Sequence, residues 1–233
     1  TYRPQIVRLP VLTWQRRVFR RLVKTLAQCL VWLFIRVKIT GQENFPQQGS
    51  ALMVSNHLGD ADVLLGIALS PRPLELIAKA ELYDFPILGW ILEQYGVIWI
   101  HRGQPDRPAL RAALQALEQK RLVCIAPEGR ESLSGNLEEG TRGAAYLALK
   151  SQVGVIPITY THTENWRVIH NLKHLKKTDI TITIGNAFQI KTNLAKKHQL
   201  DTGTQEIMQR LAAQLPQNYR GEYLTKEPTD DCQ

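Results

Sequence analysis

A histidine and an aspartate five residues apart, His57 and Asp62, are the side chains of this sequence best suited to acid–base chemistry. They lie in a polar stretch, residues 55–62, between the apolar runs 51–54 and 63–65, which predicts a loop between a buried strand and a helix. A neutral imidazole can remove a proton near neutral pH, and a neighbouring carboxylate can fix its tautomer. We therefore expect His57 to activate a hydroxyl group, and that hydroxyl can be the substrate's own.

The same stretch leaves other roles open for its residues. Asp60 could be the N-cap of the following helix, or it could compete with Asp62 as the partner of His57. Asp62 could be only a first-turn carboxylate favoured by the helix dipole, and His57 only a loop residue that caps the helix. Cys124 is a less suitable nucleophile, because it lies inside an apolar run, where thiols are usually inert.

The elements that must position these residues follow from short apolar runs that alternate with helical patterns. Strands are expected at 51–55, 74–79, 97–100, 121–126, 154–161 and 179–184, and helices at 60–70, 86–95, 106–119, 140–151 and 204–214. This alternation predicts an α/β fold with a mixed, largely parallel central sheet flanked by helices. Ligands gather at the carboxyl ends of such strands, so His57, Arg102 and Glu128, which follow three of them, are expected to share one cleft.

The basic charge of the chain is concentrated at its N-terminal end. Residues 1–40 hold nine Lys and Arg and no acidic residue, whereas the rest of the chain carries 20 basic and 21 acidic side chains. Helical periodicity over 11–30 places five cations on one arc, opposite a broad apolar arc: Arg16, Arg17, Arg20, Arg21 and Lys24. Such an amphipathic helical segment suits an anionic membrane surface, and the alternative is a helix packed on the domain with its arginines in water. A nucleic-acid partner is not expected, because the stripe lacks base-reading side chains.

These patterns predict three parts of the chain. Residues 1–40 would be the membrane-associating helical segment, 41–215 the globular domain, and 216–233 a loose C-terminal tail with two prolines. The apolar run 30–35 is too short to span a bilayer but could dip into one. Three cysteines without C-x-x-C spacing indicate neither a disulfide framework nor a zinc site, so we expect a reducing compartment. His162, His170 and His174 lack metal-ligand spacing, and no Walker loop or G-x-G-x-x-G motif occurs, so we expect no metal and no cofactor.

Four motifs occur in a set order within residues 38–190. They are Asn56-His57 with Asp62, the run Gly96–Arg102, the run Pro127–Ser132 with Gly135, and Pro157 inside an apolar strand. This order resembles the glycerolipid acyltransferase family, the 1-acylglycerol-3-phosphate acyltransferases. The resemblance implies a glycerolipid acyltransferase-like fold and an enzyme. That enzyme would move a fatty acyl group from acyl-CoA or acyl carrier protein to the free hydroxyl of 1-acyl-sn-glycerol-3-phosphate, giving phosphatidic acid.

The resemblance also implies roles for residues around the expected cleft. His57 and Asp62 would be the catalytic pair. The substrate-binding residues would be Lys79, Arg102, Glu128, Gly129 and Arg130. Guanidinium groups offer paired donors to phosphate, and a glycine loop lets backbone N–H groups approach an anion, although plain surface or ion-pair roles remain the alternative. The partners would be a lysophospholipid acceptor, the thioester donor and an anionic membrane surface, with the protein peripheral or monotopic on the cytoplasmic face.

The third motif departs from the family pattern. Arg130 and Glu131 stand where the family usually has Thr and Arg, so Arg130 could supply the cation from one position earlier, or Glu131 could signal another acceptor. Gly59 replaces a frequent Ser, and His101 replaces a frequent Asp. Two alternatives therefore stay open. One is the same chemistry on glycerol-3-phosphate or another lysolipid, and the other is a non-catalytic lipid-binding protein on the same scaffold.

Overall fold

One mixed sheet of seven strands organises the computed structural model, which describes residues 3–103, 106–190 and 196–224. The strands are β1 (Ile35–Thr40), β2 (Ala51–Ser55), β3 (Leu74–Lys79), β4 (Ile98–Ile100), β5 (Leu122–Ile125), β6 (Gly154–Thr161) and β7 (Thr178–Ile184). They lie in the order β1-β7-β6-β2-β5-β3-β4. The pair β6–β7 is antiparallel and every other neighbouring pair is parallel, which confirms the mixed, largely parallel sheet.

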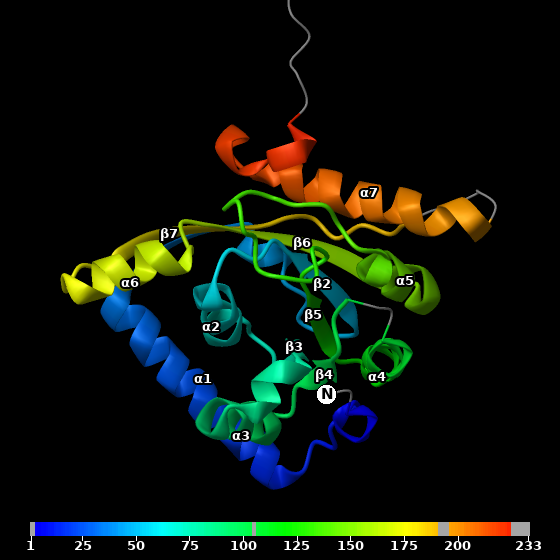
Figure 1. Cartoon of the computed structure of the whole chain (residues 1–233), viewed down its shortest axis with the longest axis horizontal. Coiled ribbons are helices and arrows are strands. Elements are labelled where there is room, and N and C mark those ends of the chain that lie inside the picture. The colour runs from blue at the N-terminus through cyan, green and yellow to red at the C-terminus, as the bar shows by residue number, and fades with distance from the viewer. Residues whose placement is uncertain (1–2, 104–105, 191–195, 225–233) are drawn as a thin grey trace, which may run out of the picture.

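Helices cover both faces of this sheet (Figure 1). They are α1 (Trp14–Phe34), α2 (Asp60–Leu69), α3 (Pro86–Tyr95), α4 (Arg107–Glu118), α5 (Arg142–Ser151), α6 (Asn165–Lys173) and α7 (Lys196–Gln214). Helices α4, α5 and α7 contact one another in sequence on one face, while α2 packs against α1 and α6 on the other. The result is a three-layer α/β arrangement, in which connections between parallel strands cross over through helices.

The central strands form because their sequences are apolar on both sides. All five residues of β2 are buried, and β2 lies between β5 and β6 at the centre of the sheet. A parallel strand covered on both faces is expected to be a continuous apolar run. The predicted bounds of β2, β3, β6 and α3 are confirmed, and those of the other predicted strands, α2, α4 and α5 differ by one or two residues at an end.

Four segments differ from the expectation. Helix α7 begins at Lys196, eight residues before the predicted start at 204. The apolar run 30–35 does not form a separate element: α1 ends at Phe34, and β1 begins at Ile35 and pairs with β7. Helix α6 was not predicted. The loose tail is wrong for residues 216–224, because they form two short 3-10 helices and Tyr219 is buried, with its hydroxyl donating to Glu164 at 2.7 Å. The remainder of that predicted tail lies outside the described residues.

Helix α1 attaches to the body through its basic face. Arg20 is buried, and its Nη1 and Nη2 each donate to one carboxylate oxygen of Glu75 at 2.8 Å. Arg16 and Lys24, on the same face, donate to backbone carbonyls of α3 and of Ser70. The picture of a helix with all its arginines in water is therefore wrong, because two of them tie the helix to the domain.

The outward face of α1 is largely apolar. We name its large exposed apolar side chains the α1 stripe: Trp14, Val18, Leu22, Leu26, Trp32 and Leu33. Within the described part of the chain, no helix has the length and apolarity that crossing a membrane requires. The α1 stripe is thus a surface feature, in a helix whose opposite side is bound to the sheet domain.

Candidate active site

The loop after β2 brings His57 and Asp62 together. His57 Nδ1 lies 3.0 Å from Asp62 Oδ2. The same carboxylate oxygen accepts the backbone N–H groups of Leu58, at 2.7 Å, and Gly59, at 3.1 Å. Asp62 is in the first turn of α2, so it caps the helix and orients the histidine with one oxygen. The capping role and the orienting role, which were alternatives in the sequence, coexist.

The second aspartate of this loop does not compete for the histidine. Asp60 is exposed, and its backbone N–H donates to Oδ1 of Asn165 at 3.0 Å. Gly59 precedes it with an extended backbone, and a Cβ placed on Gly59 would lie 2.5 Å from the carbonyl oxygen of Thr163. The close approach of the loop before α6 therefore explains why glycine stands at this position.

Carboxylates surround the imidazole and favour its protonated form. Burial acts to lower the pKa of His57, but the hydrogen bond and charge of Asp62, together with the charges of Glu131 and Glu128, outweigh it and raise that pKa above its usual value. A pair Nδ1–H···Asp62 leaves the other ring nitrogen, Nε2, as the base. Among the described residues none hydrogen bonds Nε2, and the His57 side chain is 25% exposed, so a substrate can reach it.

Glu128, from the loop after β5, holds the backbone of the site by hydrogen bonds. It is buried, and its Oε1 accepts the His57 backbone N–H at 3.2 Å while its Oε2 accepts the Glu138 N–H at 2.9 Å. Burial raises the pKa of Glu128 to about 7, against the lowering effect of these hydrogen bonds. Glu128 thus joins the loops after β2 and β5, as does the bond from the Ser132 N–H to the His57 carbonyl.

The candidate cations are placed unequally around the pair. Lys79 ends β3, and its charge acts to lower the pKa of Glu131, which burial raises. Arg102 follows β4 and is exposed at the rim, with Nη1 3.4 Å from the carbonyl oxygen of Gly129. Arg130 instead directs Nε and Nη2 at one carboxylate oxygen of Glu138, at 3.0 and 2.8 Å.

Gly129 does not offer its backbone N–H to an anion. That N–H donates to the carbonyl oxygen of Ala126 at 3.0 Å, in a turn where Gly129 has a φ of +73°. Glycine is therefore placed here by the turn. Of the predicted substrate-binding residues that the structure describes, Glu128 is hydrogen bonded to His57, Arg102 approaches the Gly129 carbonyl, and Gly129 and Arg130 make contacts within their own loop.

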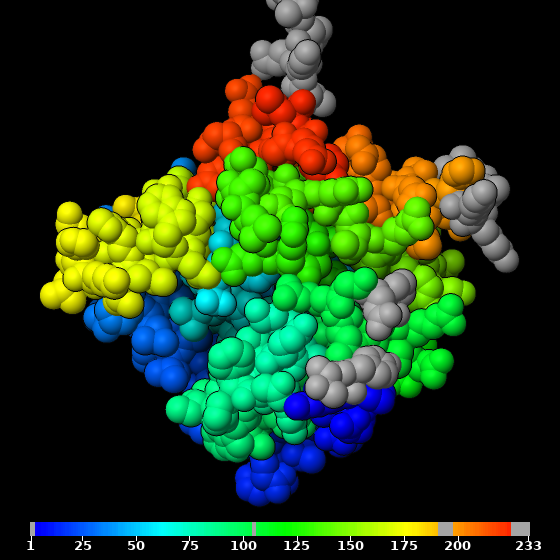
Figure 2. All heavy atoms as spheres, in the orientation of Figure 1, coloured from blue at the N-terminus to red at the C-terminus, as the bar shows by residue number. Residues whose placement is uncertain are grey.

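Asn165 is a site residue that the sequence did not reveal. Its Oδ1 accepts the Asp60 N–H, and its Nδ2 donates to Glu131 Oε1 at 2.9 Å. It thereby joins the start of α6 to two loops of the site. Figure 2 shows the cyan segment after β2 at the floor of a hollow, between yellow α6, the teal region of α3 and the green loop after β5. Both partners are distant in sequence, so no local pattern marks this asparagine.

A second histidine–aspartate pair lies at the end of β4 with the same spacing. His101 Nδ1 is 3.1 Å from Asp106 Oδ2, and Asp106 also accepts the Ala109 N–H at the start of α4. Here, however, Nε2 of His101 accepts the backbone N–H of Arg3 at 3.0 Å. The cysteine considered as a nucleophile is also unsuited, because burial raises the pKa of the Cys124 thiol to about 11.

This combination of fold and site was compared with known proteins. A family model described as "Acyltransferase" matches residues 36–161, more than half of the chain. The chain belongs to the acyltransferase family. The matched segment runs from β1 to the end of β6 and contains both the His57–Asp62 pair and Glu128.

Named relatives of this acyltransferase extend the comparison. A chloroplastic 1-acyl-sn-glycerol-3-phosphate acyltransferase of Arabidopsis thaliana is 29% identical over 153 residues, which are 64% of this chain and 43% of that protein. The human 1-acyl-sn-glycerol-3-phosphate acyltransferase alpha is 31% identical over 135 residues, 57% of this chain and 48% of its own. The chain spans about half the length of the curated relatives it matches.

A solved structure shares the fold. The crystal structure of the 1-acyl-sn-glycerophosphate (LPA) acyltransferase PlsC from Thermotoga maritima superposes with a TM-score of 0.62 at 19% identity. The match covers 85% of this chain and 81% of that one. It confirms the predicted acyltransferase-like architecture, including the helices that flank the sheet.

Proposed function

We propose that this acyltransferase moves a fatty acyl group from acyl-CoA or acyl carrier protein to the free hydroxyl of 1-acyl-sn-glycerol-3-phosphate, which gives phosphatidic acid. The observation that carries the proposal is the His57–Asp62 pair, with a 3.0 Å contact at Nδ1 and a histidine side chain that is 25% exposed. The names of the relatives support the choice of acceptor.

The chemistry requires one proton transfer in each direction. His57 Nε2 takes the proton of the acceptor hydroxyl as its oxygen attacks the thioester carbonyl carbon. Asp62 stabilises the imidazolium that forms. The carbon–sulfur bond then breaks, and the imidazolium returns the proton to the leaving thiolate. Because the thioester is already activated, no acyl-enzyme is needed, and general-base help of this kind contributes about 10²–10⁴-fold to the rate.

The acceptor is tested with a panel of hydroxylated lipids against both donor types. We expect 1-acyl-sn-glycerol-3-phosphate to have the highest kcat/KM, with glycerol-3-phosphate and lysolipids that have larger headgroups as comparison acceptors. Thiol release must match ester formation mole for mole. Absence of ester with every acceptor, in protein that binds the thioester, would leave the non-catalytic lipid-binding alternative as the better description.

One observation favours a second acceptor class. Glu131, rather than an arginine, lies within electrostatic reach of His57, and Arg130 is bound to Glu138. Burial and the charges of Asp60 and Asp62 keep the pKa of Glu131 raised despite His57. A phosphate dianion beside this group of carboxylates is disfavoured, whereas a hydroxyl or ammonium group could donate to Glu131. If a lysolipid with such a headgroup has a higher kcat/KM in the panel than lysophosphatidate, the second acceptor class is the correct one.

We further propose that the α1 stripe contacts an anionic membrane surface. Helix α3 packs against α1, with the rings of Phe19 and Trp90 5.8 Å apart edge to face, and it also exposes Ile87 and Leu88. Two adjacent helices with exposed aromatic and aliphatic side chains are typical of an interfacial contact. Such a contact would bring the hollow to the layer where a lysolipid acceptor is found.

A further inference from the structure

We propose that helix α6 and the turn after it form a second binding surface for anionic lipid headgroups, which adjoins both the active site and the α1 stripe. The inference rests on the proposed function, because that function requires work at a lipid surface. It adds a particular patch, its ligand chemistry and a place for a phosphate group. The patch consists of residues 166–177 together with Arg36 of β1.

One side of this patch is apolar and has no cover. None of the nine residues of α6, all of which the structure describes, is buried. Trp166 is 67% exposed, and Ile169, Leu172 and Leu175 follow at three-residue spacing, with Leu175 90% exposed. Single exposed apolar side chains are ordinary, but four in succession along a helix and its C-terminal turn indicate an interaction surface.

The backbone at Leu175 strengthens this conclusion. Leu175 lies two residues after α6 with a φ of +53°, in the left-handed conformation that follows many helices and usually selects glycine. A leucine in this position is disfavoured by its Cβ, and its side chain gains no packing within the protein. A bilayer would supply the missing burial of this side chain, which neither the turn nor the fold provides.

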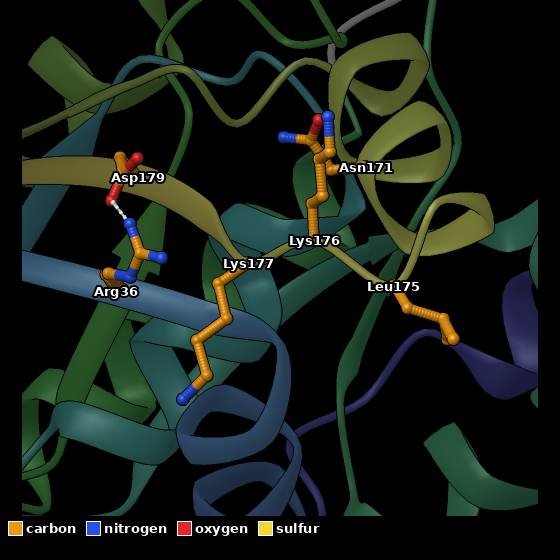
Figure 3. A pocket seen from close by; sticks show the side chains of 6 residues that line it. All are labelled: Arg36, Asn171, Leu175, Lys176, Lys177 and Asp179. Carbon is orange, nitrogen blue, oxygen red and sulfur yellow. Dashed lines mark hydrogen bonds and ion pairs between the residues drawn. The ribbon is translucent and has the colours of Figure 1, made fainter.

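The other side of the patch is cationic and contains a pocket (Figure 3). The lining residues are Arg36, Asn171, Leu175, Lys176, Lys177 and Asp179. Asp179 is the one acidic residue among these six, and it pairs with Arg36 at 3.2 Å. Figure 3 shows Leu175 pointing away from the polar side chains, so the turn separates a leucine from a group of cations. An anionic lipid layer has the complementary arrangement, because its phosphates can bind the cations while its apolar region takes up the leucine.

The patch is continuous with both the α1 stripe and the active site. Lys177 Nζ donates to the carbonyl oxygen of Trp32 at 2.6 Å and lies 5.4 Å from the centroid of the Trp32 ring. At its other end, α6 begins with Asn165, which binds Glu131 in the site. Helix α6 therefore runs from Asn165, which contacts the candidate site, to a turn beside the C-terminal end of α1 (Figure 1). Apolar and cationic groups together favour a lipid surface over an acidic protein or a nucleic acid, which would need only the cations.

Vesicle binding tests the cationic half of the proposal. The full chain is sedimented with phosphatidylcholine vesicles that contain or lack phosphatidylglycerol, as wild type and as Lys176→Glu/Lys177→Glu. A basic residue near an anionic surface contributes about 1 kcal/mol, so we expect the apparent affinity for the phosphatidylglycerol vesicles to fall by about fivefold or more for each lysine replaced. The control Arg111→Glu/Lys150→Glu makes the same charge change on exposed positions of α4 and α5 and should bind almost as wild type.

The apolar half is tested at Leu175. Leu175→Gly suits the left-handed backbone, so the Tm should stay the same or rise, while binding to the same vesicles weakens several-fold. Leu175→Met should restore binding, because it keeps an apolar side chain of similar size. Acyl transfer in detergent micelles should be retained by all these variants, which separates failure of this patch from failure of the proposed function.

Three results would overturn the proposal. The first is unchanged binding of Lys176→Glu/Lys177→Glu or of Leu175→Gly to phosphatidylglycerol vesicles. The second is an equal loss in the Arg111→Glu/Lys150→Glu control, which would show a general effect of net charge. The third is intact vesicle binding with a rate loss confined to acyl carrier protein as donor, which would identify the patch as a protein-docking surface.

Discussion

Two histidine–aspartate pairs with identical spacing and a contact between Nδ1 and the carboxylate occur among the described residues, and they differ in what surrounds the histidine. In both, the histidine follows a strand of the sheet, and its Nδ1 lies about 3 Å from the carboxylate of an aspartate in or before the next helix: 3.0 Å for His57 and 3.1 Å for His101. The pairs differ at Nε2. Nε2 of His101 accepts a backbone N–H of Arg3, whereas no described residue hydrogen bonds Nε2 of His57, whose side chain is 25% exposed.

The surroundings of the two pairs explain this difference. The carboxylates of Glu128 and Glu131 are near His57, and their charges act together with Asp62 to raise the pKa of His57. Asp106 places its second oxygen on the N–H of Ala109 and so acts as the N-cap of α4, while the second oxygen of Asp62 is buried with no partner among the described residues. A His-x4-Asp spacing therefore builds a helix start in both places, and the neighbouring loops decide which of the two has the surroundings of a candidate catalytic site.

The largest expected effect comes from removing each imidazole. His57→Ala should lower kcat/KM by about 10²–10⁴-fold, because the acceptor hydroxyl loses its base. His101→Ala should change kcat/KM little and should cost about 1 kcal/mol of stability through the lost bond to Arg3. Steady-state rates with a thioester donor, together with the Tm of each variant, measure both effects. Equal rate losses in the two variants would break the distinction between the pairs.

The next largest difference is expected between variants of the two aspartates, Asp62 and Asp106. Asp62→Asn keeps an oxygen for the N–H groups of Leu58 and Gly59 but loses the charge that stabilises the imidazolium, so we expect a rate loss between about 10-fold and 10⁴-fold. Asp106→Asn should retain activity but lower the Tm, because the two oxygens of Asp106 accept the N–H groups of His101 and Ala109 and an asparagine has only one acceptor oxygen. A fully active Asp62→Asn would mean that the capping role alone explains this residue.

Replacing the glycine near each pair should have a smaller effect on the rate. In Gly59→Ala the new Cβ would approach the Thr163 carbonyl to 2.5 Å, so the loop that carries His57 must move. We expect a loss of about 1–3 kcal/mol in stability and up to about 10²-fold in rate. Gly103→Ala, next to the other pair, meets no atom within 4 Å and is disfavoured only by its φ of +89°, so the Tm should fall slightly with the rate retained. The reverse order of rates would contradict this account of Gly59.

The sequence predicts the part of this architecture that depends on local patterns. Strand β2 is a continuous apolar run, and α3 is bounded by Pro86 and Gly96, so both follow directly from residue type. The convergence of His57 and Glu128 follows from the rule that strand ends meet at one edge of the sheet. The same information predicts the α/β class, because alternating strands and helices have few stable arrangements.

Contacts between distant residues could not be predicted in this way. Arg20 belongs to the basic arc of α1, but its partner Glu75 lies 55 residues away, and a helical wheel does not show which face packs on the sheet. Asn165 bridges Asp60 and Glu131 from a helix with no buried residue, so α6 left no periodic signal. Strand β1 was missed because it directly continues the apolar end of α1, although Arg36-Val37-Lys38-Ile39 alternates as an exposed edge strand should.

The smallest effect is a shift in the pH dependence of the rate. The neutral form of His57 is the base, so the rate should rise as pH increases through its pKa, and this rise should lie above the ordinary histidine value of about 6.5. Glu131→Gln removes one of the charges that raise this pKa but keeps an oxygen for Asn165. The midpoint should therefore move to lower pH, with the maximal rate changed less than in the variants above.

Glu118→Gln, an exposed carboxyl at the end of α4, is the matched control and should not move the midpoint. An unmoved or raised midpoint in Glu131→Gln would show that Asp62 and Glu128 alone set the basicity of His57, and would leave Glu131 to the recognition of the acceptor.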